Sequence, residues 1–166
     1  MELYIFRHGE ADAREAGMPD RDRALTPRGK RDVKAVAALA RRAKVAPDMV
    51  FTSPLRRARE TAALAAEVFG TGKPVETKAL TPEARPEAIW KEIVDLVSKQ
   101  KGAVDQIMLA GHEPHMSRLI VFLLEAAVVV DLKKGSLVRV STPGKNGPPR
   151  GVLKWMITPR IAQGGK

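Results

Sequence analysis

The sequence has no cysteine among its 166 residues, which excludes disulfide bonds, thiolate catalysis and cysteine-ligated zinc. It also lacks the run of roughly 18 apolar residues that a membrane-spanning helix needs. Its longest apolar stretch, residues 119–130, is interrupted by Glu125. The chain goes directly into a strand pattern, without the basic and then apolar leader of an exported protein. We therefore expect one domain over residues 1–166, in a cytoplasmic protein.

Aromatic residues make up only 4% of the sequence, and acidic residues are missing after residue 131. The aromatic side chains lie in apolar patterns, so the stacking platforms of proteins that bind single-stranded nucleic acid are not indicated. Residues 132–166 carry eight Lys and Arg and no Asp or Glu, within a net charge of +10. This asymmetry favours an anionic partner, namely nucleic acid, an acidic protein or phosphate, and it equally fits a solvated basic face.

What is present is an alternation of strand and helix patterns. The predicted strands are residues 3–6, 48–53, 73–80 and 106–110, followed by a hairpin of residues 137–141 and 151–158; the predicted helices are residues 26–44, 55–69, 86–98 and 114–127. Thr26 and Pro27 are residue types that begin a helix. The alternation predicts an α/β fold of three layers, α/β/α, with a mostly parallel central sheet, helices on both faces and a C-terminal antiparallel hairpin.

The three strongest predicted strands each end in residues that can bind an anion. These strand ends are Arg7-His8-Gly9, Ser53-Pro54-Leu55-Arg56-Arg57 and Gly111-His112. Parallel strands bring their carboxyl ends to one edge of the sheet, where α/β proteins bind ligands. Imidazoles and guanidiniums without carboxylate partners are costly to gather unless an anion neutralises them. Because arginine forks match phosphate oxygens, the sequence predicts a phosphate site.

Histidine supplies a nucleophile at this expected site. A neutral imidazole can attack phosphorus without first losing a proton from a high pKa. One of the two histidines, His8 or His112, would carry the phosphoryl group, while the arginines and the other histidine would stabilise charge on the phosphoryl oxygens. The alternative for His8 is a structural histidine at the end of a strand, and phosphate binding by itself would need no imidazole.

In their order and spacing, the strand ends resemble the signatures of the histidine phosphatase (phosphoglycerate mutase-like) superfamily. The motifs are the Arg7-His8-Gly9 (RHG) motif, Ser53-Pro54-Leu55-Arg56-Arg57-Ala58, Gly111-His112 and the helix-opening Leu25-Thr26-Pro27-Arg28-Gly29. The resemblance implies a phosphoglycerate mutase-like fold in which His8 is the transiently phosphorylated nucleophile. It also implies that Arg7, Arg57 and His112 line the phosphate pocket.

Four further residues are candidates at the same site. Gly9 would let the backbone or a ligand come close, and Ser53 would support the site by hydrogen bonding. Arg21, in the loop of residues 10–25, could reach toward the anion of the substrate or pair with its acidic neighbours. Glu83 lies where larger relatives draw a general acid; the alternative is an exposed loop residue.

A subgroup is indicated by the short interval from residue 80 to residue 105, which leaves no room for the helical lid of larger relatives. Short chains with Gly111-His112-Glu113-Pro114, and with a hairpin ending in Trp155-Met156-Ile157-Thr158-Pro159, resemble the bacterial SixA-type phosphohistidine phosphatases. The resemblance implies a phosphatase that removes phosphate from histidine on a phosphotransfer protein. An open site also suits a protein-borne phosphate better than an enclosed metabolite.

We expect no cofactor and no metal. His112 and His115 could suggest a metal pair, but they lack a third ligand at a suitable spacing. Two other functions stay open at this point. One is a small-molecule phosphomonoesterase of the same superfamily; the other is a non-catalytic module that binds phosphate or nucleic acid through the basic segment 132–166.

Overall fold

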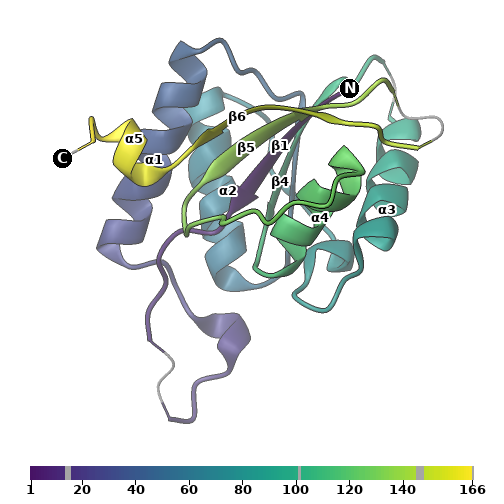
Figure 1. Ribbon diagram of the computed structural model, residues 1–166. Helices are drawn as coiled ribbons and strands as arrows, with labels where there is room; N and C mark the ends of the chain where they lie inside the picture. Colours follow the sequence, from purple (N-terminus) through teal and green to yellow (C-terminus); the bar gives the residue numbers. More distant parts are fainter. Residues whose placement is uncertain (14–15, 101, 145–147, 166) are drawn as a thin grey trace.

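The computed structural model describes residues 1–13, 16–100, 102–144 and 148–165, shown in Figure 1. Strands and helices alternate over most of the chain. In order, they are β1 (Glu2–Arg7), η1 (Asp20–Asp22), α1 (Pro27–Arg42), β2 (Met49–Thr52), α2 (Arg56–Phe69), β3 (Val75–Glu76), η2 (Lys78–Leu80), α3 (Pro86–Ser98), β4 (Gln106–Gly111), α4 (His115–Leu124), β5 (Leu137–Ser141), β6 (Val152–Ile157) and α5 (Pro159–Ala162), where η marks a 3-10 turn.

One sheet holds all six strands in the order β3-β2-β4-β1-β5-β6. β1 and β2 both pair in parallel with β4, and β3 pairs in parallel with β2. β5 runs antiparallel to β1, and β6 runs antiparallel to β5. The predicted α/β architecture, with its mostly parallel sheet and C-terminal hairpin, is confirmed. The parallel pairing places the ends of β1, β2 and β4 at one edge.

The alternation of side chains along β1 explains why helices cover both faces of the sheet. Leu3 and Ile5 belong to an apolar core that also contains buried residues of α3 and α4. Tyr4 and Phe6 belong to a second core, with buried residues of α1 and α2. Figure 1 shows these helix pairs on opposite faces. The apolar residues from Leu3 to Phe6 are therefore buried on both faces of this central strand.

The structure differs from the predicted elements at three places. The strand expected over residues 73–80 forms only at Val75–Glu76, because the Thr77 hydroxyl accepts a hydrogen bond from the Ala79 N–H and turns the chain into η2. The helix expected to residue 127 ends at Leu124, and Glu125 follows with a left-handed φ of 49°. The unpredicted α5 begins after Thr158, whose side chain accepts from the Ile161 N–H.

No helix within the described ranges is long and apolar enough to cross a membrane. The cytoplasmic location expected from the sequence stays a prediction, as does the single domain over residues 1–166.

The turn after β1 packs against the first turn of α1 through two glycines. A Cβ atom on Gly29 would lie 2.1 Å from the backbone oxygen of Glu10, and one on Gly9 would lie 2.9 Å from the backbone oxygen of Gly29. Real Cβ contacts are never this short, and backbone atoms cannot move aside as a flexible side chain does. The close approach of these two segments therefore requires glycine at both positions.

We predict that Gly29→Ala lowers the free energy of unfolding by about 1–3 kcal/mol, the usual cost of overpacking. Chemical denaturation of the variant and the wild type measures the difference. Gly72→Ala is the matched control, because a Cβ atom there meets no other atom within 4 Å. Equal stability of Gly29→Ala and the wild type would contradict the close-packing argument.

Candidate active site

His8 lies directly after β1, and its two ring nitrogens have different partners. Nδ1 is 2.7 Å from the backbone oxygen of Gly9. Because a carbonyl oxygen can only accept, Nδ1 carries the proton in this contact. Nε2 then holds the lone pair, and it accepts a hydrogen bond from Nε of Arg57 at 3.3 Å. The imidazole is thus fixed in one tautomer, with its nucleophilic nitrogen facing a guanidinium.

Arg57, in the first turn of α2, is buried and donates in three directions. Besides its bond to His8, its Nη1 donates to the backbone oxygen of Asp20 at 2.8 Å, and its Nη2 donates to Asp20 Oδ2 at 2.9 Å. Asp20 belongs to η1, in the loop that extends beyond the end of β1 in Figure 1. The carboxylate of Asp20 therefore lies where a phosphate oxygen would meet this guanidinium.

His112 follows β4 and completes the pair of imidazoles at this edge of the sheet. The centres of the His8 and His112 rings are 5.1 Å apart. His112 Nε2 is 2.8 Å from the hydroxyl of Ser53, at the end of β2, and that hydroxyl also accepts from the Leu55 N–H. Nδ1 of His112 is buried and has no partner among the described residues. In the tautomer that carries its proton on Nδ1, with the Ser53 hydroxyl donating to Nε2, this nitrogen can donate to a bound anion.

His115 supports His112 from behind. Its ring centre is 5.9 Å from that of His112, and its Nε2 accepts from the backbone N–H of His112 at 3.4 Å. Within the described residues, no group of three His, Cys, Asp or Glu could hold a metal ion. The contact to the backbone N–H gives His115 a structural role next to His112.

Arg7, the last residue of β1, is half-buried and keeps one donor without a partner. Its Nη1 donates to the backbone oxygen of Leu132 at 2.5 Å. Its Nε is buried and makes no hydrogen bond within the described part of the chain. Arg7 thus stands beside His8 with a buried donor that no described residue satisfies.

Burial keeps all three imidazoles neutral, and nearby positive charge adds to this effect at His8 and His112. Burial, with the nearby charges of Arg57 and Arg7, lowers the pKa of His8 to about 3, although the bond to Gly9 opposes the shift. Burial and the neighbouring His8 and Arg57 lower the pKa of His112 to about 2. Burial lowers the pKa of His115 to about 4. The His8 imidazole is therefore uncharged and ready to attack at any neutral pH.

The positive charges that keep His8 and His112 neutral keep the carboxyl group of Asp20 ionised. Burial alone would raise the pKa of Asp20, but hydrogen bonds from Arg23 and Arg57 outweigh burial and lower that pKa below its usual value. Arg23 Nη1 lies 3.0 Å from Asp20 Oδ1. Asp20 is thus a carboxylate anion that partly neutralises the cationic site while no phosphate is bound.

The structure brings His8, Arg7, Arg57, His112 and Ser53 together at one edge of the sheet, whereas the remaining candidates lie differently. The N–H of Gly9 donates to the Thr61 hydroxyl at 3.2 Å, so it already has a partner. Arg21 has a side chain that is 78% exposed and faces Asp22, with 3.8 Å between Nε and Oδ2. Glu83 is exposed in the loop before α3, where its charge acts on His115.

Sequence reasoning missed Asp20 and Thr61, two residues that hold the site together. From the sequence, Asp20 was expected only as a possible ion-pair partner in its loop, and Thr61 was given no role of its own. Thr61 lies one turn after Arg57, and its hydroxyl donates to the Arg57 backbone oxygen at 2.8 Å while accepting from Gly9. The spacing of four residues on α2 was a usable signal for Thr61; the contact of Asp20 depends on how a long loop folds back.

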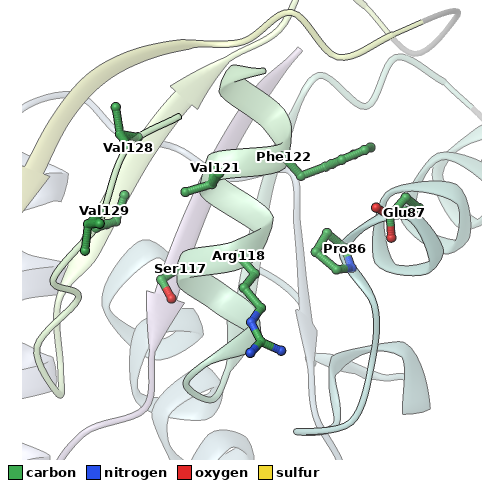
Figure 2. A pocket seen from close by; sticks show the side chains of 9 residues that line it. Pro86, Glu87, Ser117, Arg118, Val121, Phe122, Val128 and Val129 are labelled. Atoms are coloured by element: carbon green, nitrogen blue, oxygen red, sulfur yellow. The ribbon is translucent and has the colours of Figure 1, made fainter. Parts of the chain in front are cut away.

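A separate apolar hollow of about 550 Å³ lies between α3 and α4, as Figure 2 shows. Val121, Phe122 and Val128 are among its apolar lining residues, and Arg118 and Glu87 are its charged lining residues. None of its lining residues is an imidazole or belongs to the three strand ends. This hollow therefore adds no candidate catalytic residue to those at the sheet edge.

Two imidazoles and two guanidiniums at one sheet edge are suited to bind a phosphoryl group, and comparison with known proteins gives the class of the protein. The model of the histidine phosphatase superfamily (branch 1) matches residues 3–111. The chain belongs to this superfamily and is a phosphatase. It is 34% identical over 118 residues to an uncharacterized protein of Picosynechococcus sp. (strain PCC 7002), an alignment that covers 70% of this chain and 68% of that protein.

Solved structures share the fold at low sequence identity. The protein histidine phosphatase SixA in complex with tungstate superposes with a TM-score of 0.86 at 21% identity, covering 97% of this chain and 99% of that one. A structure described as a SixA phosphohistidine phosphatase from Agrobacterium tumefaciens gives a TM-score of 0.75 at 21% identity, covering 95% and 97%. A mycobacterial glucosyl-3-phosphoglycerate phosphatase gives 0.72 at 20% identity, covering 93% and 97%. These likenesses confirm the fold.

We predict that the folded state loses stability between pH 7.5 and pH 5. An unfolded imidazole takes up a proton near pH 6.5, whereas the folded imidazoles stay neutral at this pH. The unfolded state then binds more protons, so stability falls as the pH falls, by up to about 2 kcal/mol at pH 5 for each imidazole. Urea denaturation at the two pH values measures the slope, and His115→Gln should reduce it. A flat profile would contradict the burial of neutral imidazoles.

We predict that Asp20→Asn tightens the binding of inorganic phosphate about fivefold. The amide oxygen can still accept from Arg57, but the negative charge that opposes the anion is gone, which is worth about 1 kcal/mol. Isothermal titration calorimetry measures the change. Asp22→Asn, in the same turn but facing Arg21, is the matched control and should bind as the wild type does. Weaker binding by Asp20→Asn would mean instead that the carboxylate is needed to hold Arg57.

Proposed function

We propose that this protein is a phosphohistidine phosphatase, which removes the phosphoryl group from a histidine of a phosphotransfer protein through a phospho-His8 intermediate. The observation that carries the proposal is the state of His8. Its Nδ1–H is held by the Gly9 carbonyl and its Nε2 lone pair faces Arg57, in an imidazole that stays neutral. An oriented, uncharged nucleophile beside a guanidinium suits attack on a phosphoryl group.

The proposed reaction has two displacements at phosphorus. In the first, Nε2 of His8 forms a bond to phosphorus while the P–N bond of the substrate breaks, and the substrate imidazole leaves with its electron pair. In the second, a water oxygen attacks phospho-His8, gives up a proton to solvent, and releases inorganic phosphate and neutral His8. Arg7, Arg57 and His112 would bind the phosphoryl oxygens in both transition states.

The leaving group decides whether this reaction needs a general acid from the protein. An imidazole leaves easily, since it takes its proton from solvent or arrives already protonated, whereas an alkoxide must be protonated as it leaves. Asp20, the carboxylate that reaches the site through Arg57, is also bound to Arg23. Asp20 has a lowered pKa, which makes it a poor proton donor at neutral pH. This arrangement favours phosphohistidine over phosphate esters.

The fixed position of α3 also favours a phosphate carried by a protein. The interval of residues 80–105, which would hold a lid, is occupied by α3. Ile89, Ile93 and Val97 bury α3 in the core against the sheet, so this helix cannot close over His8. A phosphohistidine on a protein surface needs such an unobstructed approach, whereas a small metabolite is better held in an enclosed pocket.

Two other functions make different predictions. A small-molecule phosphomonoesterase needs a general acid, for which Glu83 is the candidate; it is exposed and lies on the His115 side of the site. A module that binds nucleic acid through residues 132–166 would lose affinity steeply with salt, by release of counterions. It would also keep its affinity when His8 is replaced.

The test is turnover without added metal on three substrates: a phosphohistidine peptide, an aryl phosphate and a sugar phosphate. We expect a strong preference for phosphohistidine in kcat/KM, and a loss of about 10³-fold or more in His8→Ala, because the nucleophile is gone. Wild type quenched with alkaline detergent during turnover should carry a phosphoryl group that is lost in acid and stable in base, as a phosphoimidazole is.

Glu83→Gln is the companion variant. On phosphohistidine it should turn over as the wild type does, because the leaving imidazole needs no acid from the protein. Turnover of the esters alone, with a large loss in Glu83→Gln, would replace the proposal with a phosphomonoesterase. Turnover that survives in His8→Ala would overturn the phospho-His8 intermediate.

A further inference from the structure

A basic hollow adjoins the candidate site on the side of Arg7. It has a volume of about 510 Å³, and it is built from the start of α1, the loop before β5 and the start of α5. Its cationic lining residues are Arg7, Arg28, Lys133, Lys134 and Arg160. Because Arg7 borders both the hollow and His8, a group bound in the hollow would lie next to the reacting phosphate.

The two acidic side chains of the hollow already have partners. Glu10 Oε1 accepts from the Thr26 hydroxyl at 3.0 Å. Asp32 Oδ1 accepts from Gln163 Nε2 at 2.6 Å, and Asp32 Oδ2 lies 3.8 Å from Arg28 Nε. With five cations and two carboxylates among its lining residues, the hollow keeps a positive charge.

Lys134 and Arg160 are exposed cations of the hollow whose charge no described acidic side chain neutralises. Lys133 forms an ion pair with Asp131 at 2.7 Å, but neither Lys134 nor Arg160 forms an ion pair within the described part of the chain. Both side chains are exposed. The N–H of Gly135 donates to the backbone oxygen of His8 at 3.0 Å, which fixes the loop that carries Lys134 beside the nucleophile.

We infer that this basic hollow receives an acidic side chain, Asp or Glu, that flanks the phosphohistidine on the substrate protein. The inference rests on the proposed function and adds a determinant of specificity: Lys134 and Arg160 select substrates with a carboxylate beside the phosphorylated histidine. It also gives a function to the acid-free segment 132–166, which contains both residues.

The chemistry of the two cations suits a protein surface. Long, exposed Lys and Arg side chains can adapt to a carboxylate presented at several angles, and they attract an acidic face before contact. The hollow of about 510 Å³ has room for a side chain, and its lining includes Arg7, which stands beside His8. Since exposed charges are screened within about 10 Å at 0.1 M salt, the selection should weaken as salt is added.

The experiment compares two phosphohistidine peptides of equal length, one with Glu and one with Gln on both sides of the phosphohistidine. For the wild type we expect kcat/KM to be about tenfold higher on the acidic peptide at low salt, with the preference reduced in 0.5 M salt. The double variant Lys134→Gln/Arg160→Gln should lose most of this preference through KM, while its turnover of the neutral peptide stays as in the wild type. Lys154→Gln, a matched control, removes an exposed lysine of the same basic segment outside the hollow and should keep the preference.

A second readout separates this inference from the proposed function. Fluorescence anisotropy with the unphosphorylated acidic peptide tests the hollow without any catalysis, and the double variant should bind it about tenfold more weakly than the wild type. Equal binding by both, or an acidic preference that survives in the double variant, overturns the inference. Binding that depends on Lys134 and Arg160, without turnover of either peptide, supports the hollow as an acidic subsite and overturns the phosphohistidine activity instead.

Discussion

The rest of this structure depends on keeping one imidazole buried, neutral and in a fixed tautomer. The His8 side chain is only 8% exposed, and two guanidiniums lie close to it. Protonation would place a third cation in the same small volume, so burial and charge both favour the neutral ring. The Gly9 carbonyl then decides which nitrogen holds the lone pair. Nucleophilicity at neutral pH is thus a property of the surroundings more than of histidine itself.

This constraint explains much of the local architecture. The turn after β1 must bend sharply enough for His8 to reach its own neighbour's carbonyl, and it must pass close to α1, which Gly9 and Gly29 allow. Thr61 ties the same turn to α2 by accepting from the Gly9 N–H. Because α2 also carries Arg57, the nucleophile and its guanidinium are held by one connected set of backbone contacts. Positioning of this kind is where most catalysis of phosphoryl transfer originates.

The charge around the site is arranged in two zones. Close to His8, Asp20 offsets part of the positive charge of Arg57 and leaves a site that an anion can complete. Further out, the basic hollow keeps cations that the described chain does not pair, at Lys134 and Arg160. The inner zone suits a phosphoryl group that any substrate of the class would bring. The outer zone is placed to distinguish one phosphorylated protein from another.

The sequence by itself determined the elements and the identity of the residues at the strand ends. Continuous apolar runs predicted buried parallel strands, and Arg7, His8 and His112 follow two of those strands directly, so the sheet edge that gathers them was foreseeable. The short end of α4 and the 3-10 turn after β3 were not, because single side-chain caps and one left-handed residue override a weak propensity.

Only the tertiary structure decided the tautomer of His8, the pairing of Asp20 with Arg57 and the basic hollow. Each of these joins segments whose relative positions follow from packing, such as η1 with α2, which are 37 residues apart at their contact. Local propensity is a property of neighbouring residues, whereas these contacts depend on how loops fold back over the sheet edge. A sequence pattern contains the partners but not the distance between them.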